Sequence, residues 1–464
     1  MLRSLGVLVP PPVLRFISVL SVLFTGTLVA VALAFLTQIL MTRALPVADV
    51  GVIAALLTVI NFLTSAGTAG VNYFLLQVFG SEGWGAVRWL SPCTKLTAIG
   101  SILSSIALSG YVFLRKDDYT ENISFTIAFC LLILIGQVSV ELASARFQLE
   151  GRYAGLSAWQ GVTQAGRFAV VSICTLCGGP LKWVIIGYAL VGLITTAISL
   201  MVLRDVLRGK LQLYGQSKSP RADLVEAGLP NPTVGRTTIL SLPFTMMTMF
   251  YVMYFQGPIV TLEWISGPAS AGVYNSAFLI ISAVSLIPSV IYMRFLLPKI
   301  CRWAAHDREF FRAAFHVGVP MMLLTGACIM ALVMSLGPWL VPVVFGQRYA
   351  AGLPALMILA VVIPVRFVTA VYGSLFIGGK DLLRKVRYLG ISALVGAVSC
   401  LCLVPSFGIN GAATATVLAE ASLLILHIKG TSRFIDGINV METLRMSTFR
   451  SSLQHLVTER NTGT

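Results

Sequence analysis

The chain has 464 residues, of which 57% are hydrophobic and only 11% are charged. A soluble globular protein carries about 25% charged residues, so this composition excludes an ordinary soluble domain. The net charge of +15 would fit a nucleic-acid-binding protein, but the apolar residues come in runs of about 18 or more, the length of a membrane-spanning helix. The sequence therefore predicts an all-α integral membrane protein with no nucleic-acid partner.

About twelve membrane-spanning helices are expected, and the longest connection between them lies mid-chain. Their approximate ranges are 16–41, 50–78, 94–114, 123–144, 156–177, 183–203, 238–260, 271–296, 314–336, 353–377, 388–404 and 411–428. The long connection contains Pro220, Pro230 and Pro232, which favour an irregular linker. The pattern predicts an N-terminal six-helix bundle (1–203), a cytoplasmic linker (204–237), a C-terminal six-helix bundle (238–430) and a cytoplasmic tail (431–464).

The excess of positive charge is explained by topology. With the N-terminus placed inside, most of the 33 lysines and arginines fall in connections on the cytoplasmic side, as the positive-inside rule expects. Anionic head groups favour the same placement. Residues 16–41 are too long for the apolar core of a cleaved signal peptide, so they are expected to form the first span. Both termini are then cytoplasmic.

A weak internal repeat supports two halves of the same orientation. At one common offset, Ala48, Gly51 and Val52 match Ala269, Gly272 and Val273, and Phe74, Leu75 and Leu76 match Phe295, Leu296 and Leu297. Two halves of six spans each would be related by a pseudo-two-fold axis along the membrane normal. Six identities in an apolar background can also arise by chance.

Three arginines, Arg167, Arg294 and Arg366, stand within predicted spans. A charge at bilayer depth costs a few kcal/mol and usually faces a bundle interior or a water-filled cavity. Guanidinium groups recognise phosphates and carboxylates by paired hydrogen bonds. These arginines therefore suit a diffuse anion better than a metal ion.

Arg366 follows Pro364 closely in the tenth span, and a proline can break a helix at that point. Arg366 could contact a diffuse anion such as a phosphate in a cavity. Alternatively, it could form an internal ion pair with Glu420, midway along the twelfth span. The two interpretations are not exclusive.

Arg167 shares one helical face with Gln160, Thr163 and Gln164, because the four follow the i, i+3, i+4, i+7 pattern. A polar stripe in an apolar helix faces either a cavity or another helix, and both remain open. Arg294 lies at the inner end of the eighth span, where its side chain can reach the head groups or a cavity.

Further polar residues complete the set of candidates. Arg43, at the outer end of the first span, can pair with Asp49 or serve at a cavity mouth. Glu141 and Glu420 could exchange protons with a gradient, or they could only pair with basic groups. Other candidates for sugar contacts are Asn61, Asn72, Tyr73, Gln256 and Asn275. No cofactor or catalytic residue is expected, because no catalytic signature occurs. Cys174 and Cys177 have CxxC spacing, but no second pair or nearby histidine supports a metal site.

Three stretches carry a family resemblance. Residues 41–71 contain an Arg-x-Leu-x-x-x-Asp-x-Gly turn, and residues 271–300 end in Leu-Pro-Lys followed by Ile. Residues 341–380 contain Phe-Gly-x-x-Tyr-x-x-Gly before a span and Gly-Lys after it, and residues 404–424 contain Gly-x-x-Gly-Ala-Ala. In order and spacing, these motifs resemble the oligosaccharide flippase (Wzx-like polysaccharide transporter) family of the multidrug/oligosaccharidyl-lipid/polysaccharide (MOP) exporter superfamily.

The resemblance covers about 12–430 and implies both a fold and a function. The fold would be MATE-like, with two six-helix bundles facing a cationic cavity. From their own positions in the sequence, the residues we expect to line it are Arg366, Arg167, Arg294, Arg43, Gln164, Gln160 and Asn61. Glu420 and Glu141 are the candidates for coupling transport to an ion. The substrates implied are polyprenyl-pyrophosphate-linked oligosaccharides, flipped by alternating access across the bacterial inner membrane for O-antigen, exopolysaccharide or capsule synthesis. Membrane lipids and other polysaccharide assembly proteins are the remaining expected partners.

Three alternatives stay open. A cation-coupled multidrug exporter of the same superfamily would need an acidic cavity, which the intramembrane arginines argue against. The lipid II flippase branch usually has two extra helices, for which this chain has no room. A polysaccharide polymerase or ligase would need a sizeable loop to carry its catalytic groups, whereas the predicted outer connections are short.

Overall fold

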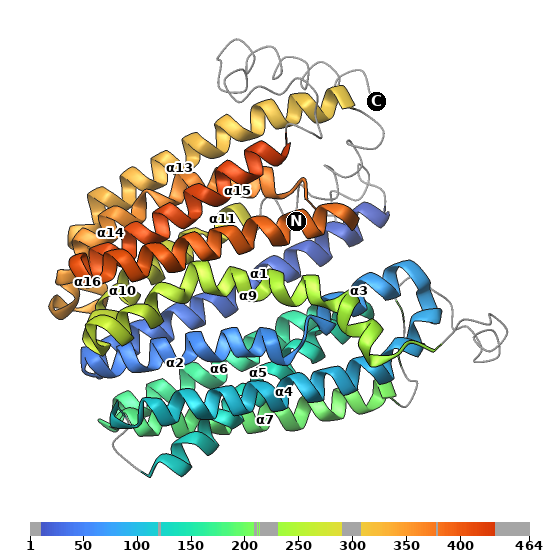
Figure 1. Ribbon diagram of the computed structural model, residues 1–464, viewed down its shortest axis with the longest axis horizontal. Helices are drawn as coiled ribbons and strands as arrows, with labels where there is room; N and C mark the ends of the chain where they lie inside the picture. Colours follow the sequence, from blue (N-terminus) through green and yellow to red (C-terminus); the bar gives the residue numbers. More distant parts are fainter. Residues whose placement is uncertain are drawn as a thin grey trace. The chain divides into compact units, whose positions relative to one another are not determined.

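A computed structural model of the protein describes residues 11–118, 122–207, 211, 213, 231–289, 308–376 and 379–431. All regular elements in these ranges are helical (Figure 1). The α-helices are α1 (Pro11–Ala44), α2 (Val47–Gly67), α3 (Val71–Glu82), α4 (Leu90–Leu114), α5 (Ile123–Leu149), α6 (Tyr153–Leu176), α7 (Leu181–Leu207), α9 (Val234–Ser266), α10 (Pro268–Val284), α11 (Leu286–Ser289), α13 (Arg308–Phe345), α14 (Leu353–Ala360), α15 (Val362–Gly373) and α16 (Gly379–Thr431). Short 3-10 turns are η1 (Gly83–Trp89), η2 (Lys116–Asp118) and η4 (Gln347–Gly352).

Helices are the expected solution for apolar segments, because a bilayer core offers no water to satisfy backbone N–H and C=O groups. Eight of the described helical stretches are long and apolar enough to cross a membrane. The predicted all-α, multi-pass membrane architecture is confirmed, whereas the count of twelve spans stays a prediction.

The described residues form two compact units. Unit 1 contains those within Met1–Leu45 and Val59–Met249, and unit 2 contains those within Pro46–Thr58 and Phe250–Thr464. Most of the predicted linker and all but the first residue of the predicted tail lie outside the described residues. The predicted domain limits therefore stay a prediction.

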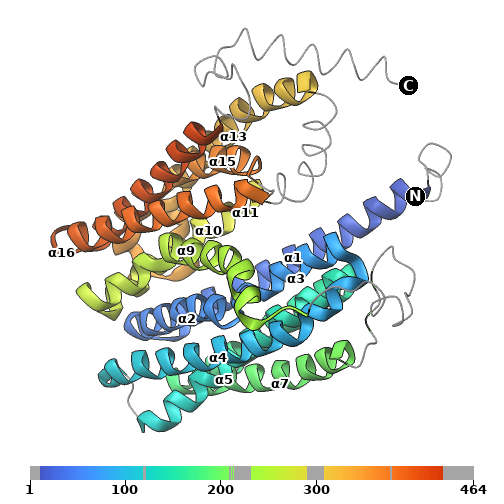
Figure 2. The ribbon, with the colours of Figure 1, turned by 45° about the vertical axis from the view of Figure 1, so that its right-hand side comes forward.

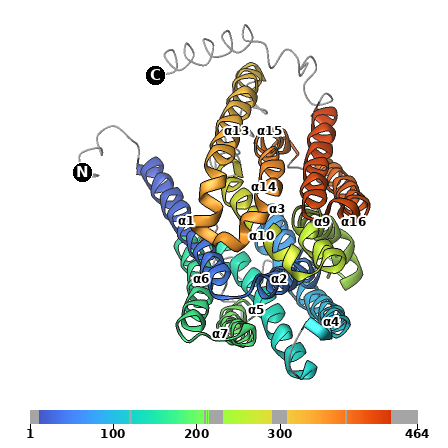
Figure 3. The same cartoon turned by 90° about the vertical axis from the view of Figure 1, so that its left-hand side faces the viewer.

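Unit 1 is a bundle in which α5 packs along both α4 and α7, while α1 packs along α6. Figures 1 and 2 show α4, α5 and α7 side by side, and Figure 3 shows α1 beside α6. At the α5–α7 contact, Gly136 and Gly192 bring the two backbones together, since a Cβ on Gly136 would lie 2.5 Å from Cα of Gly192. Small residues at such crossings let membrane helices pack by close van der Waals contact.

In unit 2, α15 packs against α13 and α16. The helix α16 holds two predicted spans, 388–404 and 411–428, as two arms that reverse direction at Gly408 (φ 51°). The arms are antiparallel, because Gly411 lies against the backbone of Leu403 and the hydroxyl of Ser422 donates to that of Ser392 at 3.1 Å.

The structure divides the span predicted at 50–78 into two helices, α2 and α3. The break contains two left-handed residues, Ala69 (φ 49°) and Gly70 (φ 66°). A Cβ on Gly70 would lie 2.7 Å from the backbone of Ser241 and Thr245 in α9, so only glycine fits beside that helix. Left-handed backbone at an alanine costs roughly 1–2 kcal/mol. Such strain is often kept where it positions functional groups.

The span predicted at 353–377 is also divided, and here the sequence predicted the cause. Pro364 has no N–H to donate to the carbonyl four residues earlier, and α14 ends at that residue, Ala360. The next helix, α15, begins at Val362. Gly326 of α13 packs against this break, since its Cβ would lie 2.7 Å from Cα of Pro364.

The glycines matched by the internal repeat meet where α2 crosses α10. A Cβ on Gly51 would overlap the carbonyl oxygen of Pro268, and a Cβ on Gly272 would overlap the carbonyl oxygen of Val47. Val47 and Pro268 correspond at the same offset as Gly51 and Gly272. A reciprocal contact of this kind is what equivalent residues make next to a two-fold axis. It supports the predicted repeat.

We expect Gly51→Ala to destabilise the protein by about 1–3 kcal/mol, the usual cost of overpacking a filled contact. The added methyl group meets backbone atoms, which cannot rotate away. Thermal unfolding of the purified protein in detergent measures the effect. Gly257→Ala in α9 is the matched control, because its Cβ would meet nothing within 4 Å. Equal unfolding temperatures for the two variants would show that the α2–α10 crossing is not tightly packed.

Candidate functional site

Arg366 and Glu420 meet inside unit 2. Arg366 stands in the first turns of α15, just after the break at Pro364, and its Nη1 lies 3.4 Å from Oε2 of Glu420 on α16. The Arg366 side chain is 12% exposed and that of Glu420 is 1% exposed. Removing either partner of such a buried pair leaves an uncompensated charge. The ion pair that the sequence offered as a structural role for Arg366 is therefore present.

Aromatic side chains of α9 hold the guanidinium of Arg366. Its Cζ lies 3.7 Å from the ring centroid of Phe255 and 5.6 Å from that of Tyr251. Nη2 of Arg366 also donates to the hydroxyl of Tyr251 at 2.6 Å. Cation–π contacts contribute roughly 0.5–2 kcal/mol each. Tyr254 packs edge-on against Tyr251 at 5.6 Å. We call Arg366, Glu420 and these three aromatic residues the arginine cluster.

The aromatic residues were not among the candidates from the sequence. Tyr251, Tyr254 and Phe255 follow an i, i+3, i+4 spacing that places them on one face of α9. That spacing was the available signal. Aromatic residues are so common in apolar helices, with 25 phenylalanines in this chain, that the spacing does not stand out by itself.

The arginine cluster can accept a further ligand at its exposed end. A guanidinium carries five N–H donors in one plane, and its two terminal nitrogens already contact Glu420 and Tyr251. Tyr251 is 40% exposed, so this end of the cluster is open. The Arg366–Glu420 pair is neutral overall. An anion would consequently have to compete with Glu420 for Arg366, since no net charge would attract it.

Arg167 lies in unit 1, at the contact between α6 and α7. Its guanidinium carbon lies 5.5 Å from the ring centroid of Tyr188, which is itself buried. Gln160 and Gln164, on the same predicted stripe of α6, are half-buried. Arg167 thus lies beside a neighbouring helix, and both the cavity role and the interhelical role of this stripe stay predictions.

A second polar group in unit 1 surrounds Glu141. Asn72 donates to Oε2 of Glu141 at 3.1 Å, and Thr64 donates to Oε1 of Gln137 at 3.3 Å. Gln137 and Glu141 are one turn apart on α5, so they share a face. Asn72 is buried, whereas Glu141 is exposed. We call Glu141, Asn72, Gln137 and Thr64 the carboxylate cluster.

The broken helix α2–α3 positions the carboxylate cluster. Because α3 begins at Val71, immediately after Gly70, its first turn carries Asn72 towards α5. The next residue, Tyr73, stacks on Phe244 of α9, with ring centroids 6.4 Å apart, and is 42% exposed. The predicted sugar candidates Asn72 and Tyr73 are therefore brought beside the predicted ion-coupling residue Glu141.

Arg146, which follows Glu141 on α5, has other partners. Its Nε lies 2.9 Å from Oε1 of Glu150, and its Nη1 lies 3.9 Å from Oδ2 of Asp205. Nη1 of Arg146 also donates to the backbone carbonyl of Val202. Arg146 is thus committed to the end of the bundle formed by α5 and α7.

The remaining candidates are placed as follows. Arg43 is exposed at the end of α1, and Asn61 is half-buried in α2. Arg294 lies outside the described residues. The binding roles of all three stay predictions.

Comparisons with known proteins agree with the fold. A sequence model of the family described as polysaccharide biosynthesis protein matches residues 19–303, more than half of the chain. No curated protein sequence matches the chain.

Three solved structures resemble it. One is the lipid II flippase MurJ in an inward closed conformation, with a TM-score of 0.67, 9% identity, and coverage of 95% of this chain and 93% of MurJ. Another is a multidrug resistance MATE family transporter of the MOP superfamily in an inward-facing conformation. Its TM-score is 0.56 at 14% identity, with coverage of 88% of this chain and 94% of that transporter. The third is a MOP superfamily transporter from Pyrococcus furiosus, described as having a binding pocket of reversed polarity. Its TM-score is 0.53 at 13% identity, with coverage of 90% of this chain and 94% of that transporter.

TM-scores of 0.53–0.67 at identities of 9–14% show a shared fold, and the structure therefore has the fold of MOP superfamily transporters. The match to the family model extends from within α1 to beyond α11. On this evidence, the chain is a multi-pass membrane protein that belongs to the polysaccharide biosynthesis protein family.

Proposed function

We propose that the protein is a flippase that moves polyprenyl-pyrophosphate-linked oligosaccharides across the bacterial inner membrane. The observation that carries the proposal is the arginine cluster, in which a guanidinium is fixed by aromatic rings beside a helix break and next to an exposed tyrosine. Membership of a polysaccharide biosynthesis family supports a sugar-containing substrate. The fold shared with a lipid II flippase supports a lipid-linked one.

Arg366 would hold the pyrophosphate of the substrate. Its planar donors match phosphate oxygens in a paired geometry, and Phe255 fixes the plane of the guanidinium at 3.7 Å. A fixed donor group loses less conformational entropy on binding than a mobile one. The exposed ring of Tyr251 would offer an apolar face and a hydroxyl to the adjoining sugar.

Glu420 would make binding of the substrate sensitive to protons. In the ligand-free protein Glu420 neutralises Arg366. A phosphate that takes over Arg366 leaves the carboxylate of Glu420 without its cation, and in a buried site such a carboxylate is costly unless it accepts a proton. Substrate and proton would then bind together at this site, so the substrate should bind more tightly as the pH falls. Glu141 in the carboxylate cluster is the second candidate for ion coupling.

Transport would follow alternating access, with the oligosaccharide and pyrophosphate passing through a polar cavity while the polyprenyl chain stays in lipid. We assign six further residues to this path, namely Arg167, Gln160, Gln164, Asn61, Arg43 and Arg294. Both termini would be cytoplasmic, and the product would serve O-antigen, exopolysaccharide or capsule synthesis, together with other polysaccharide assembly proteins.

A cation-coupled multidrug exporter is the second candidate function. The carboxylate cluster favours it, because an exposed carboxylate on an apolar helix suits a cationic substrate or ion. The arginine cluster favours the flippase. Transport measurements separate the two functions.

Arg366→Ala should slow flipping by roughly 10- to 100-fold, because charged hydrogen bonds of about 1.5–3 kcal/mol are lost. Arg366→Lys should recover only part of the rate, since an ammonium keeps the charge but not the paired geometry. The assay follows a labelled polyprenyl-pyrophosphate oligosaccharide between the leaflets of proteoliposomes.

Arg348→Ala is the matched control for this assay, because Arg348 is exposed in η4. Normal flipping by Arg366→Ala at normal abundance would reject the phosphate contact. If the wild-type protein moves no lipid-linked oligosaccharide of a sugar panel but exports a cationic dye with an ion gradient, the flippase proposal fails.

A charge-pair experiment separates binding from stability. Glu420→Ala alone should destabilise the protein by about 3–5 kcal/mol, the cost of leaving a buried cation unpaired. The double variant Arg366→Ala/Glu420→Ala should recover much of that stability, yet it should not transport. Thermal unfolding in detergent and the flipping assay measure the two effects. A double variant that transports at the wild-type rate would show that the pair serves only stability.

A further inference from the structure

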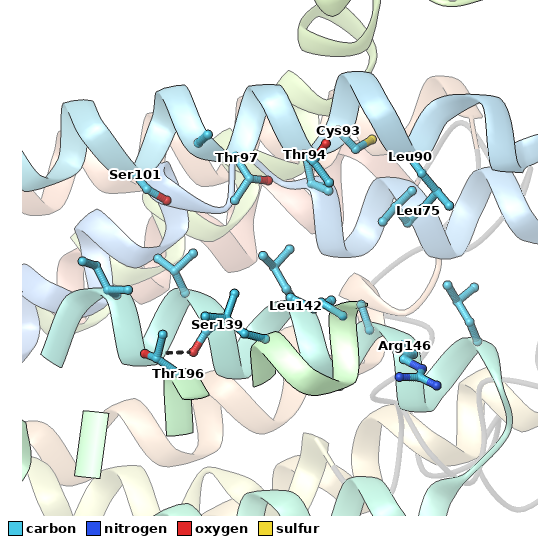
Figure 4. A pocket seen from close by; sticks show the side chains of 18 of the residues that line it. Leu75, Leu90, Cys93, Thr94, Thr97, Ser101, Ser139, Leu142, Arg146 and Thr196 are labelled. Carbon is cyan, nitrogen blue, oxygen red and sulfur yellow. Dashed lines mark hydrogen bonds between the residues drawn. The ribbon is translucent and has the colours of Figure 1, made fainter. Parts of the chain in front are cut away.

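Unit 1 contains an apolar cavity of about 350 Å³ between α3, α4, α5 and α7. Most of its wall is aliphatic, with Leu75, Leu90, Leu142, Leu149, Leu200 and Leu203 among the lining residues. Figure 4 shows the cavity elongated along α4, with Leu90 and Arg146 towards one end and Ser101 towards the other. The residues of the carboxylate cluster lie on α2, α3 and α5, and none of them lines this cavity.

The open side of the cavity is lined by exposed residues of α4 and α7. Thr94 and Ala98 of α4 are exposed, and Leu200 of α7 is 60% exposed. The surface around them is made of large apolar side chains such as Ile102 (60% exposed) and Met201 (70% exposed). In a membrane protein a surface of this kind faces lipid. A ligand would therefore enter from the hydrocarbon of the bilayer.

Two exposed cations flank this opening. Lys95 lies one turn from Ala98 on α4, and Arg204 lies one turn from Leu200 on α7. Neither is in an ion pair with a described residue. Arg146, which lines the cavity, differs from both because Glu150 and Asp205 already neutralise it. Two cations at a lipid-facing opening are complementary to an anionic head group.

A hydroxyl without a partner points into the same cavity. Thr97 is 7% exposed, and its Oγ1 has no hydrogen-bond partner among the described residues. Figure 4 shows it between α4 and α5. Threonines in helices usually donate to a carbonyl of the preceding turn, as Thr196 does to Gly192. The Thr97 hydroxyl is instead available to donate to a ligand.

We propose that the cavity binds an anionic glycerophospholipid. One acyl chain occupies the apolar interior, an ester carbonyl accepts from Thr97, and the phosphate lies between Lys95 and Arg204. The stretch of α4 from Leu90 to Ser101 rises about 16 Å, close to the depth of one leaflet in a hydrocarbon core of about 30 Å. The site is separate from the arginine cluster and does not depend on the substrate proposed above.

Native mass spectrometry of the full-length protein in detergent tests this site. After delipidation, the protein is offered phosphatidylglycerol, which is anionic, phosphatidylethanolamine, which is zwitterionic, or a polyprenyl phosphate. We expect one phosphatidylglycerol to bind about tenfold or more tightly than phosphatidylethanolamine, since each basic residue near a phosphate contributes to the affinity. Lys95→Ala/Arg204→Ala should remove this preference, and Ala98→Phe, which fills the opening, should weaken both phospholipids.

Matched variants control for unspecific effects. Lys182→Ala removes an exposed cation at the other end of α7. Ile106→Phe adds an aromatic ring on α4, two turns beyond Ala98 and outside the cavity lining. Both variants should bind like the wild type. Size-exclusion chromatography confirms that each variant is folded. An unchanged preference in Lys95→Ala/Arg204→Ala, or unchanged binding in folded Ala98→Phe, would overturn the proposal. If Ala98→Phe instead weakens only the binding of polyprenyl phosphate, the cavity binds the polyprenyl lipid and the phospholipid proposal fails.

Discussion

The buried ion pair between Arg366 and Glu420 is the interaction on which the rest of the account depends. A guanidinium in an apolar helix is stable only with a partner, and Glu420 supplies the opposite charge for Arg366. Phe255 covers the face of the guanidinium, and the Tyr251 hydroxyl accepts a hydrogen bond at its edge. The pair joins α15 to α16 and aligns both with α9. It also leaves the cluster neutral, so a ligand anion has to compete with Glu420. One pair thus contributes to the packing of unit 2 and determines the charge of the candidate site there.

Both clusters follow a helix break. Pro364 interrupts the span that carries Arg366, and the left-handed pair Ala69–Gly70 interrupts the span that carries Asn72. Breaks of this kind at membrane depth are tolerated where protein or a water-filled cavity satisfies the freed backbone groups, and in transporters they often mark binding sites. The break at Ala69 and Gly70 holds left-handed backbone, and Gly326 packs closely against the break before Pro364.

The sequence predicted the parts that depend on local chemistry or on charge. A proline's missing N–H predicted the break before α15, and the position of Glu420 midway along an apolar span offered it as an ion-pair partner for Arg366. Tertiary packing decided the rest. The break at Ala69 and Gly70 depends on the backbone of Ser241 and Thr245, more than 170 residues away along the chain. A role for Tyr251 and Phe255 follows only from their contacts with Arg366, and a role for Asn72 follows only from its hydrogen bond to Glu141.

Binding of a polyprenyl pyrophosphate to the purified protein tests the central claim most directly. If the ligand and Glu420 compete for Arg366, the variant Glu420→Gln should bind more tightly than the wild type, because its guanidinium no longer has a charged partner. Arg366→Ala should lose most of the affinity. Weaker or unchanged binding by folded Glu420→Gln would contradict the competition and would leave the pair with a structural role only.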